Sequence, residues 1–131
     1  GIKNSMGDID RLRTYRLVRP DFSVLVGNDS LIAAAYLAGC DGAVSGPSQI
    51  VPEPYTRLYA ALRSGDLATV ARTQRQIAAV AEVTAYGHVP TMKALMRQRG
   101  LPGGYVRPPF LDLEDAEARA AAERLERILQ P

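Results

Sequence analysis

The chain has little of several residue types that carry chemistry in proteins. Its one cysteine, Cys40, excludes a disulfide within the chain, so we expect a packed thiol and a reducing, cytoplasmic location. Its one histidine, His88, has no second histidine or cysteine at ligand spacing, so we expect a loop residue and no metal. Of its sixteen cationic side chains only two are lysines, Lys3 and Lys93, which leaves fourteen arginines.

Net charge and apolar runs are also small. The net charge of +2 and the scattered arginines give no electrostatic case for a nucleic-acid partner. No apolar stretch is long enough to span a membrane, so we expect no membrane partner. The 131 residues suffice for one ordinary domain, and 47% hydrophobic with 23% charged residues is a globular composition.

Short apolar runs alternate with helical patterns in the first half of the chain. The predicted strands are 1–3, 22–26 and 42–44, and the predicted helices between them are 9–18 and 31–38. We expect Asp8 to cap the first helix and Pro20 to end it, and Asp29 or Ser30 to cap the second. Strands that alternate with helices at this spacing predict βαβ units and a parallel sheet, hence an α/β fold.

The second half of the chain is predicted to be helical. The predicted helices are 55–63, 67–85, 91–99 and 113–129. Asp66 is expected to cap the longest of them and Asp112 the last. The segment 101–109 holds two glycines and a pair of prolines, and we therefore expect a loop there.

Polar or glycine-bearing turns follow all three predicted strands. Parallel strands end on one side of a sheet, and that carboxyl-terminal face is where α/β folds bind ligands. The residues expected to meet there are Lys3, Ser5, Gly27, Asn28, Asp29 and Ser45. The same residue types are also what strand-to-helix turns need, with Asp29 as an ordinary cap. The presence of Lys3 favours a catalytic site over ordinary turns, because an arginine cannot replace a lysine that must lose its proton and attack a carbonyl.

Four segments in order carry a resemblance to a known family. Residues 1–8, Gly-Ile-Lys-Asn-Ser-Met-Gly-Asp, resemble the Gly-Ile/Val-Lys-x-Ser/Thr-x-Gly-Asp segment of the dihydrodipicolinate synthase and N-acetylneuraminate lyase family. Residues 24–29 and 38–45 are similar to its next two strands with their loops, and residues 107–110 to its late Arg-Pro-Pro loop. The resemblance runs through the whole chain with few gaps.

The resemblance implies a fold and an assembly. Members of the family form a (β/α)8 TIM barrel followed by extra C-terminal helices, and usually assemble as homotetramers. Residues 1–51 would be the last three β/α units of the barrel, and 52–131 the final barrel helix and the C-terminal helical extension. Because the chain opens on what resembles the end of a strand, we expect an N-terminal part of the barrel with five further strands as a required partner.

The resemblance also implies a chemistry without a cofactor. The family consists of pyruvate-dependent class I aldolases and related lyases, and Lys3 matches the lysine that forms a Schiff base with pyruvate or another 2-oxo acid. The positions that match the pocket lining are Ser5, Gly27, Asn28, Asp29, Val44 and Ser45. The proton-shuttling tyrosine of the family lies on an earlier strand, so no tyrosine of this chain matches it. Segment 45–49 differs from the family's lysine-biosynthesis pattern and segment 28–30 from its sialic-acid pattern. A sugar acid or an uncharacterised 2-oxo acid is therefore at least as consistent with the sequence as the substrates of those two groups.

Two alternatives belong to other classes. An incomplete barrel leaves strand edges and apolar helix faces uncovered, so the chain could be a catalytically inactive fragment that acts as an assembly or interaction module. A small flavodoxin-like or response-regulator domain is a further alternative. The helical second half of the chain and the lack of an acidic cluster on an early strand disfavour it.

Overall fold

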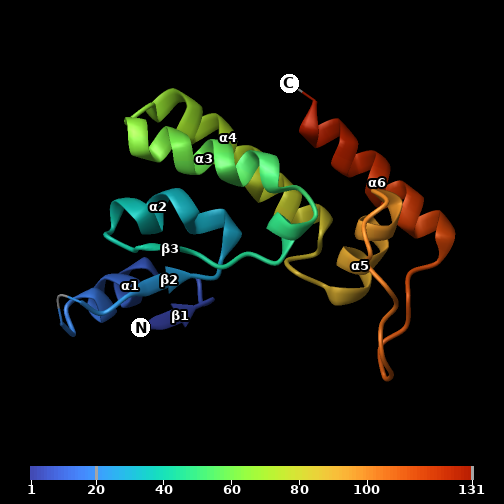
Figure 1. Cartoon of the computed structure of the whole chain (residues 1–131), viewed down its shortest axis with the longest axis horizontal. Helices are drawn as coiled ribbons and strands as arrows, with labels where there is room; N and C mark the ends of the chain where they lie inside the picture. The colour runs from blue at the N-terminus through green and yellow to red at the C-terminus, as the bar shows by residue number, and fades with distance from the viewer. Residues whose placement is uncertain (20, 131) are drawn as a thin grey trace.

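A computed structural model describes residues 1–19 and 21–130, and it confirms the parallel sheet (Figure 1). Strands β1 (Ile2–Asn4), β2 (Val24–Val26) and β3 (Gly42–Ala43) lie in the order β1-β2-β3, and both neighbouring pairs are parallel. The carboxyl ends of the three strands therefore lie along one edge of the sheet, as the sequence predicted.

The two faces of the sheet differ in what covers them. The register pairs Ile2 with Val24 and Asn4 with Val26, so these four residues share one face. Val24 and Val26 are buried there in a core cluster with Leu12 of α1 (Ile9–Arg16). Helix α2 (Ile32–Leu37) packs on the same cluster. Residues 3 and 25, which pair with each other, lie on the opposite face, away from these helices.

The caps of the first two helices are partly as predicted. Asp8 caps α1, since its Oδ1 accepts a hydrogen bond of 3.0 Å from the backbone N–H of Arg11. Pro20, expected to end this helix, lies outside the described residues. The prediction for the second helix was wrong, because a single 3₁₀ turn (Asp29–Leu31) precedes α2 and Asn28 caps it. The Asn28 amide oxygen reaches the N–H of Ser30 at 3.1 Å, the short-range geometry that Asn adopts readily.

Helices α3 (Pro52–Ser64) and α4 (Leu67–Val83) form an antiparallel hairpin above α2 (Figure 1). Between them Gly65 adopts a left-handed φ of 75°, which glycine permits at no steric cost. Asp66 caps α4 as predicted, accepting from the N–H of Thr69 at 3.0 Å. The hairpin is held to α2 by a core cluster made of Ala33, Leu58, Ala61, Val70 and Ile77.

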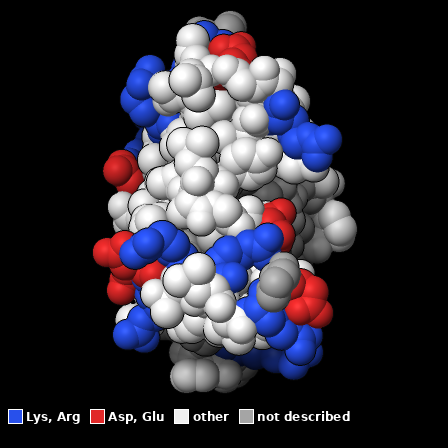
Figure 2. Space-filling view, turned by 90° about the vertical axis from the view of Figure 1, so that its left-hand side faces the viewer, with Lys and Arg blue, Asp and Glu red and all other residues white. Residues whose placement is uncertain are grey.

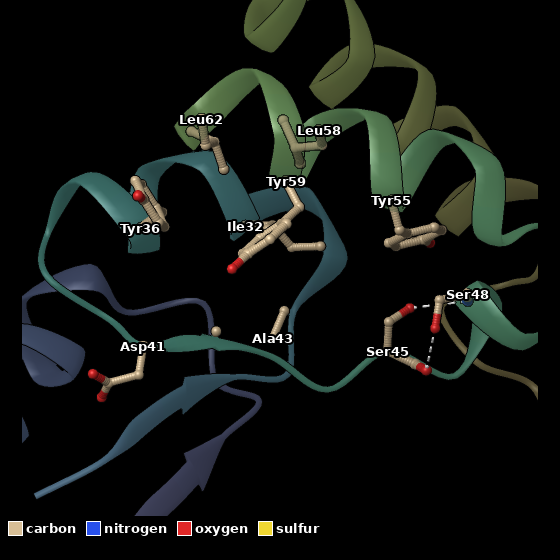
Figure 3. A pocket seen from close by; sticks show the side chains of 11 residues that line it. Ile32, Tyr36, Asp41, Ala43, Ser45, Ser48, Tyr55, Leu58, Tyr59 and Leu62 are labelled. Carbon is tan, nitrogen blue, oxygen red and sulfur yellow. Dashed lines mark hydrogen bonds between the residues drawn. The ribbon is translucent and has the colours of Figure 1, made fainter. Parts of the chain in front are cut away.

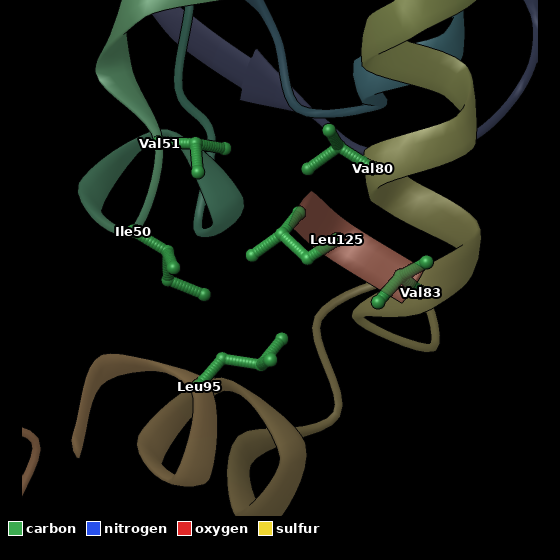
Figure 4. Packing of buried hydrophobic residues seen from close by; sticks show 6 residues of the cluster. All are labelled: Ile50, Val51, Val80, Val83, Leu95 and Leu125. Carbon is green, nitrogen blue, oxygen red and sulfur yellow. The ribbon is translucent and has the colours of Figure 1, made fainter. Parts of the chain in front are cut away.

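Helices α5 (Val89–Gln98) and α6 (Asp115–Leu129) lie at the far end of α4. A third cluster joins them to α4 and to the turn after β3 (Figure 4), and its members are Ile50, Val51, Val80, Val83, Leu95 and Leu125. Asp112 is not the cap of the last helix, because it lies 3.5 Å from Arg97 in an ion pair. Glu114 caps α6 in a capping box with Glu117. No helix of the described residues has the length and apolar character of a membrane span.

Candidate functional site

Lys3 lies at the end of β1 and packs against the glycine that follows β2. A Cβ atom built on Gly27 would stand 2.5 Å from the Cε of Lys3 and closer still to the Oγ of Ser5. Only a residue without a side chain lets these two groups approach the backbone so closely. Lys3 is exposed in this chain, so the described residues do not supply the burial expected around a neutral amine.

Six of the seven residues predicted for the site line one pocket of about 330 Å³. They are Lys3, Ser5, Gly27, Asn28, Asp29 and Val44. The seventh, Ser45, lines a neighbouring pocket of about 200 Å³ instead. The carboxyl ends of three strands thus bring together residues that are up to forty-one positions apart, as expected for parallel strands.

Asp29 and Ser45 connect the two pockets. Burial raises the pKa of the Asp29 carboxyl, and a hydrogen bond with Ser45 and the positive charge of Lys3 offset part of this rise. The Oγ of Ser45 also accepts a hydrogen bond of 3.1 Å from the backbone N–H of Ser48 (Figure 3). The Asp29 carboxyl therefore lies in the same pocket as Lys3, where its oxygens can accept hydrogen bonds.

Tyr55 is a further polar group beside Ser45, which it approaches from α3 (Figure 3). Its hydroxyl is buried and has no hydrogen-bond partner among the residues that the structure describes. Burial raises the pKa of Tyr55 above its usual range. The Ser45 side chain counters this rise in part, and the Asp29 charge adds to it. The phenol therefore stays protonated in the ordinary range of pH.

The sequence analysis missed several residues of the main pocket. They are Gly46, Pro47, Ala81, Tyr86, Gly87 and Met92. Ala85 and Tyr86 adopt left-handed φ angles of 46° and 53°, which are unusual for residues with a side chain. The turn between α4 and α5 thus brings the helical extension to the pocket. The sequence predicted a break between the helices 67–85 and 91–99, but no residue pattern indicated that the turn between them lies over the pocket.

The described residues also carry charged and metal-ligating side chains outside this pocket. On the face shown in Figure 2, cationic and anionic side chains are interspersed around uncharged surface. Within residues 1–19 and 21–130, histidine, cysteine and carboxylate side chains form no group of three that could hold a metal ion.

Comparisons with known proteins identify the class of fold and then the family. Among solved structures, a variant of the 2-keto-3-deoxygluconate aldolase of Sulfolobus solfataricus matches 98% of this chain with a TM-score of 0.88 and 27% identity. A prophage protein of the dihydrodipicolinic acid synthase family from Escherichia coli, solved with pyruvate, matches with a TM-score of 0.86 and 26% identity. The chain covers 44% and 45% of these two proteins.

Relatives in sequence agree with this match. The probable 2-dehydro-3-deoxy-D-pentonate aldolase of Escherichia coli is 34% identical over 88% of this chain and 40% of its own length. The 4-hydroxy-tetrahydrodipicolinate synthase of Heliobacterium modesticaldum is 32% identical over 95% of this chain and 42% of its own length. The N-acetylneuraminate lyase of Rhizobium meliloti is 30% identical over 98% of this chain and 44% of its own length.

The fold is the C-terminal part of a (β/α)8 barrel, with three parallel strands followed by a helical extension. The profile of the Dihydrodipicolinate synthetase family matches residues 1–128, and the chain belongs to that family. It spans less than half the length of the relatives it matches and corresponds to their C-terminal portion. The resemblance given by the four sequence segments is thereby confirmed at the level of fold and family.

Proposed function

We propose that this chain supplies the Schiff-base lysine and one wall of the pocket of a lyase or aldolase that acts on pyruvate or a related 2-oxo acid. The observation that carries the proposal is the packing of Lys3 against Gly27, in one pocket with Ser5, Asn28, Asp29 and Val44. In this proposal residues 1–51 contribute the last three β/α units. Residues 52–131 contribute the final barrel helix and the extension, and the preceding strands and further copies complete the enzyme.

The proposed reaction begins at the nitrogen of Lys3. The neutral amine attacks the ketone carbon of the 2-oxo acid, and loss of water leaves an iminium. In the cleavage direction, a base removes the proton from the hydroxyl two carbons away. The carbon–carbon bond breaks and the hydroxyl-bearing carbon leaves as an aldehyde. The electron pair of that bond forms the double bond of an enamine, while the π pair of the iminium moves to its nitrogen. Protonation of the enamine and hydrolysis of the iminium release pyruvate and restore the amine.

The other pocket residues suit a hydroxylated substrate. Ser5 offers a hydroxyl and Asp29 a carboxyl beside Lys3, and both can pair with the hydroxyl groups of a sugar acid. The aldolases among the relatives are named for deoxy sugar acids of this kind, including the pentonate aldolase of Escherichia coli. We therefore propose a 2-dehydro-3-deoxy sugar acid as the first substrate to test.

The test is chemical trapping on the intact protein, including any residues that precede Gly1 in the gene product. Borohydride reduction with pyruvate should fix a three-carbon adduct on Lys3, which peptide mass mapping locates. A Lys3→Arg variant should retain the positive charge and lose the adduct, because a guanidinium does not deprotonate. An adduct on Lys93, or on neither lysine, would contradict the proposal.

A further inference from the structure

Gln74, on the helical extension, makes two hydrogen bonds to the loop that carries Asp29. Its Nε2 donates to the backbone carbonyl of Asp29 at 2.9 Å, and its Oε1 accepts from the backbone N–H of Ala33 at 2.8 Å. Asp29 lies forty-five positions before Gln74 in the chain, and Ala33 lies forty-one positions before it. Both hydrogen bonds are therefore tertiary contacts of α4. One side-chain amide therefore spans the 3₁₀ turn and the first turn of α2.

The two backbone groups that Gln74 pairs lie at the start of the segment that leads into α2. The N–H of Ala33 lies in the first turn of α2, where a helix offers no carbonyl of its own, and Ala33 is buried. Within the loop itself the N–H groups of Ser30 and Leu31 donate to Asn28, and the Asp29 carboxyl has its hydrogen bond with Ser45, on the side of the pocket. Gln74 is thus the polar link between the loop and the hairpin above it.

We propose that Gln74 is a positioning residue, which holds the loop of Asp29 so that the carboxyl faces Lys3 and the pocket. The inference rests on the proposed function, because it assigns to Gln74 the orientation of a residue of that same site. Helix α4 also carries Ala81 into the pocket, so the extension reaches the site at two points along one helix. The helical extension therefore takes part in the site rather than only covering the barrel.

The experiment compares Gln74→Met with Gln76→Met in the intact protein. Methionine keeps the length of glutamine and removes both hydrogen bonds. Gln76 is a matched control, because it lies on the same helix and its Nε2 donates to the carbonyl of Ile128 at 2.8 Å, in α6. The first readout is amide hydrogen exchange at Ala33, and the second is the pyruvate concentration that gives half-maximal borohydride trapping on Lys3.

In Gln74→Met we expect faster amide exchange at Ala33. We also expect the half-saturating pyruvate concentration to rise by about three- to tenfold, because the net contribution of one hydrogen bond changes an equilibrium constant by about tenfold or less. Gln76→Met should leave both readouts unchanged. Asp29→Asn should also raise the half-saturating concentration. The double variant Asp29→Asn/Gln74→Met should be no worse than Asp29→Asn alone, because Gln74 acts through Asp29.

Four results would overturn the inference, and they can be told apart. Unchanged exchange at Ala33 in Gln74→Met would show that the two hydrogen bonds do not hold the loop. Faster exchange with unaltered trapping, or effects of Gln74→Met and Asp29→Asn that multiply, would show that Gln74 does not act through Asp29. A wild-type protein that is not trapped on Lys3 at all would instead reject the proposed function, and the role of Gln74 with it.

Discussion

At the scale of single residues, Gly27 decides how close Lys3 and Ser5 can come to the end of β2. A Cβ at position 27 would lie 2.5 Å from the Cε of Lys3, well inside van der Waals contact. We expect Gly27→Ala to displace the lysine and to lower the rate of pyruvate trapping by about a hundredfold, the order of loss that a displacement of about 1 Å can cause. The measurement is borohydride trapping at a fixed pyruvate concentration.

Gly42→Ala is the matched control for this substitution. Gly42 lies on β3, and a Cβ there would meet the Cδ2 of Leu25 at 3.4 Å, which a small shift accommodates. This variant should be trapped at close to the rate of the wild type. If both variants lose trapping equally, general damage to the sheet rather than crowding at Lys3 is the cause.

The unpaired hydroxyl of Tyr55 leads to a prediction about stability. A buried hydroxyl without a partner costs free energy, so Tyr55→Phe should leave the free energy of unfolding unchanged or raise it by about 1 kcal/mol. Urea unfolding of the wild type and the variant measures this difference. A loss of more than about 1 kcal/mol would mean that the hydroxyl has a hydrogen-bond partner, and Ser45 is the nearest candidate.

Residue type and spacing predicted part of the site and missed another part. Lys3, Gly27 and Asn28 could be placed together because each lies at or just after the carboxyl end of a strand of one parallel sheet, whereas Val44 was expected only from the resemblance to the family. Tyr86 could not, since its place depends on how the turn after α4 folds back over the pocket. Gln74 was equally hidden, because its partners are backbone groups that no sequence pattern marks.

At the scale of elements, the cap of α4 makes a prediction about pH. Hydrogen bonds from the backbone and side chain of Thr69 lower the pKa of Asp66 below its ordinary value. A carboxyl whose pKa is lowered by folding stabilises the folded state above its unfolded pKa, and this contribution is lost as pH falls through the lowered value. The melting temperature of the wild type should therefore fall as the pH becomes acid, in part because Asp66 becomes protonated.

Asp66→Asn isolates that contribution. Asparagine keeps an oxygen that can accept from Thr69 but does not titrate, so at neutral pH the wild type should be the more stable of the two. The difference in melting temperature should shrink as pH falls through the ordinary range of a carboxyl and below it. A difference that stays constant from neutral to acid pH would contradict the assignment.

Helices and strands were easier to predict than the positions of their ends. The pattern from Leu67 onward predicted the longest helix to within two residues of its observed end at Val83, since both a buried stripe and a capping Asp mark it. The caps at Asn28 and Glu114 were missed, because several Asx or acidic residues adjoin each start and only tertiary contacts choose among them. Asp112 shows this choice, since its carboxylate pairs with Arg97 instead of capping α6.

At the scale of the whole molecule, three clusters of buried residues follow one another from the sheet to the last helix. One lies between the sheet and α1 with α2, the second between α2 and the α3–α4 hairpin, and the third joins α4 to α5 and α6. Because Ile50 and Val51 belong to the third cluster, the helical extension is packed directly on the chain that leaves β3. The family and the fold could be inferred from four short segments because these segments follow one another in the order that the family shows.

The outer edge of β3 is the last feature with a testable consequence. Within the described residues, β3 pairs only with β2, and Ala43 on this strand is exposed. An unpaired edge is a template for another strand, so residues 1–131 studied on their own should self-associate. Light scattering at increasing concentration should show a mass above 14.2 kDa.

Ala43→Lys should reduce this association, because a lysine on an edge opposes strand pairing, whereas Ala60→Lys on the exposed side of α3 should not. A monomeric wild-type chain, or equal effects of the two lysines, would show that the edge of β3 does not drive association.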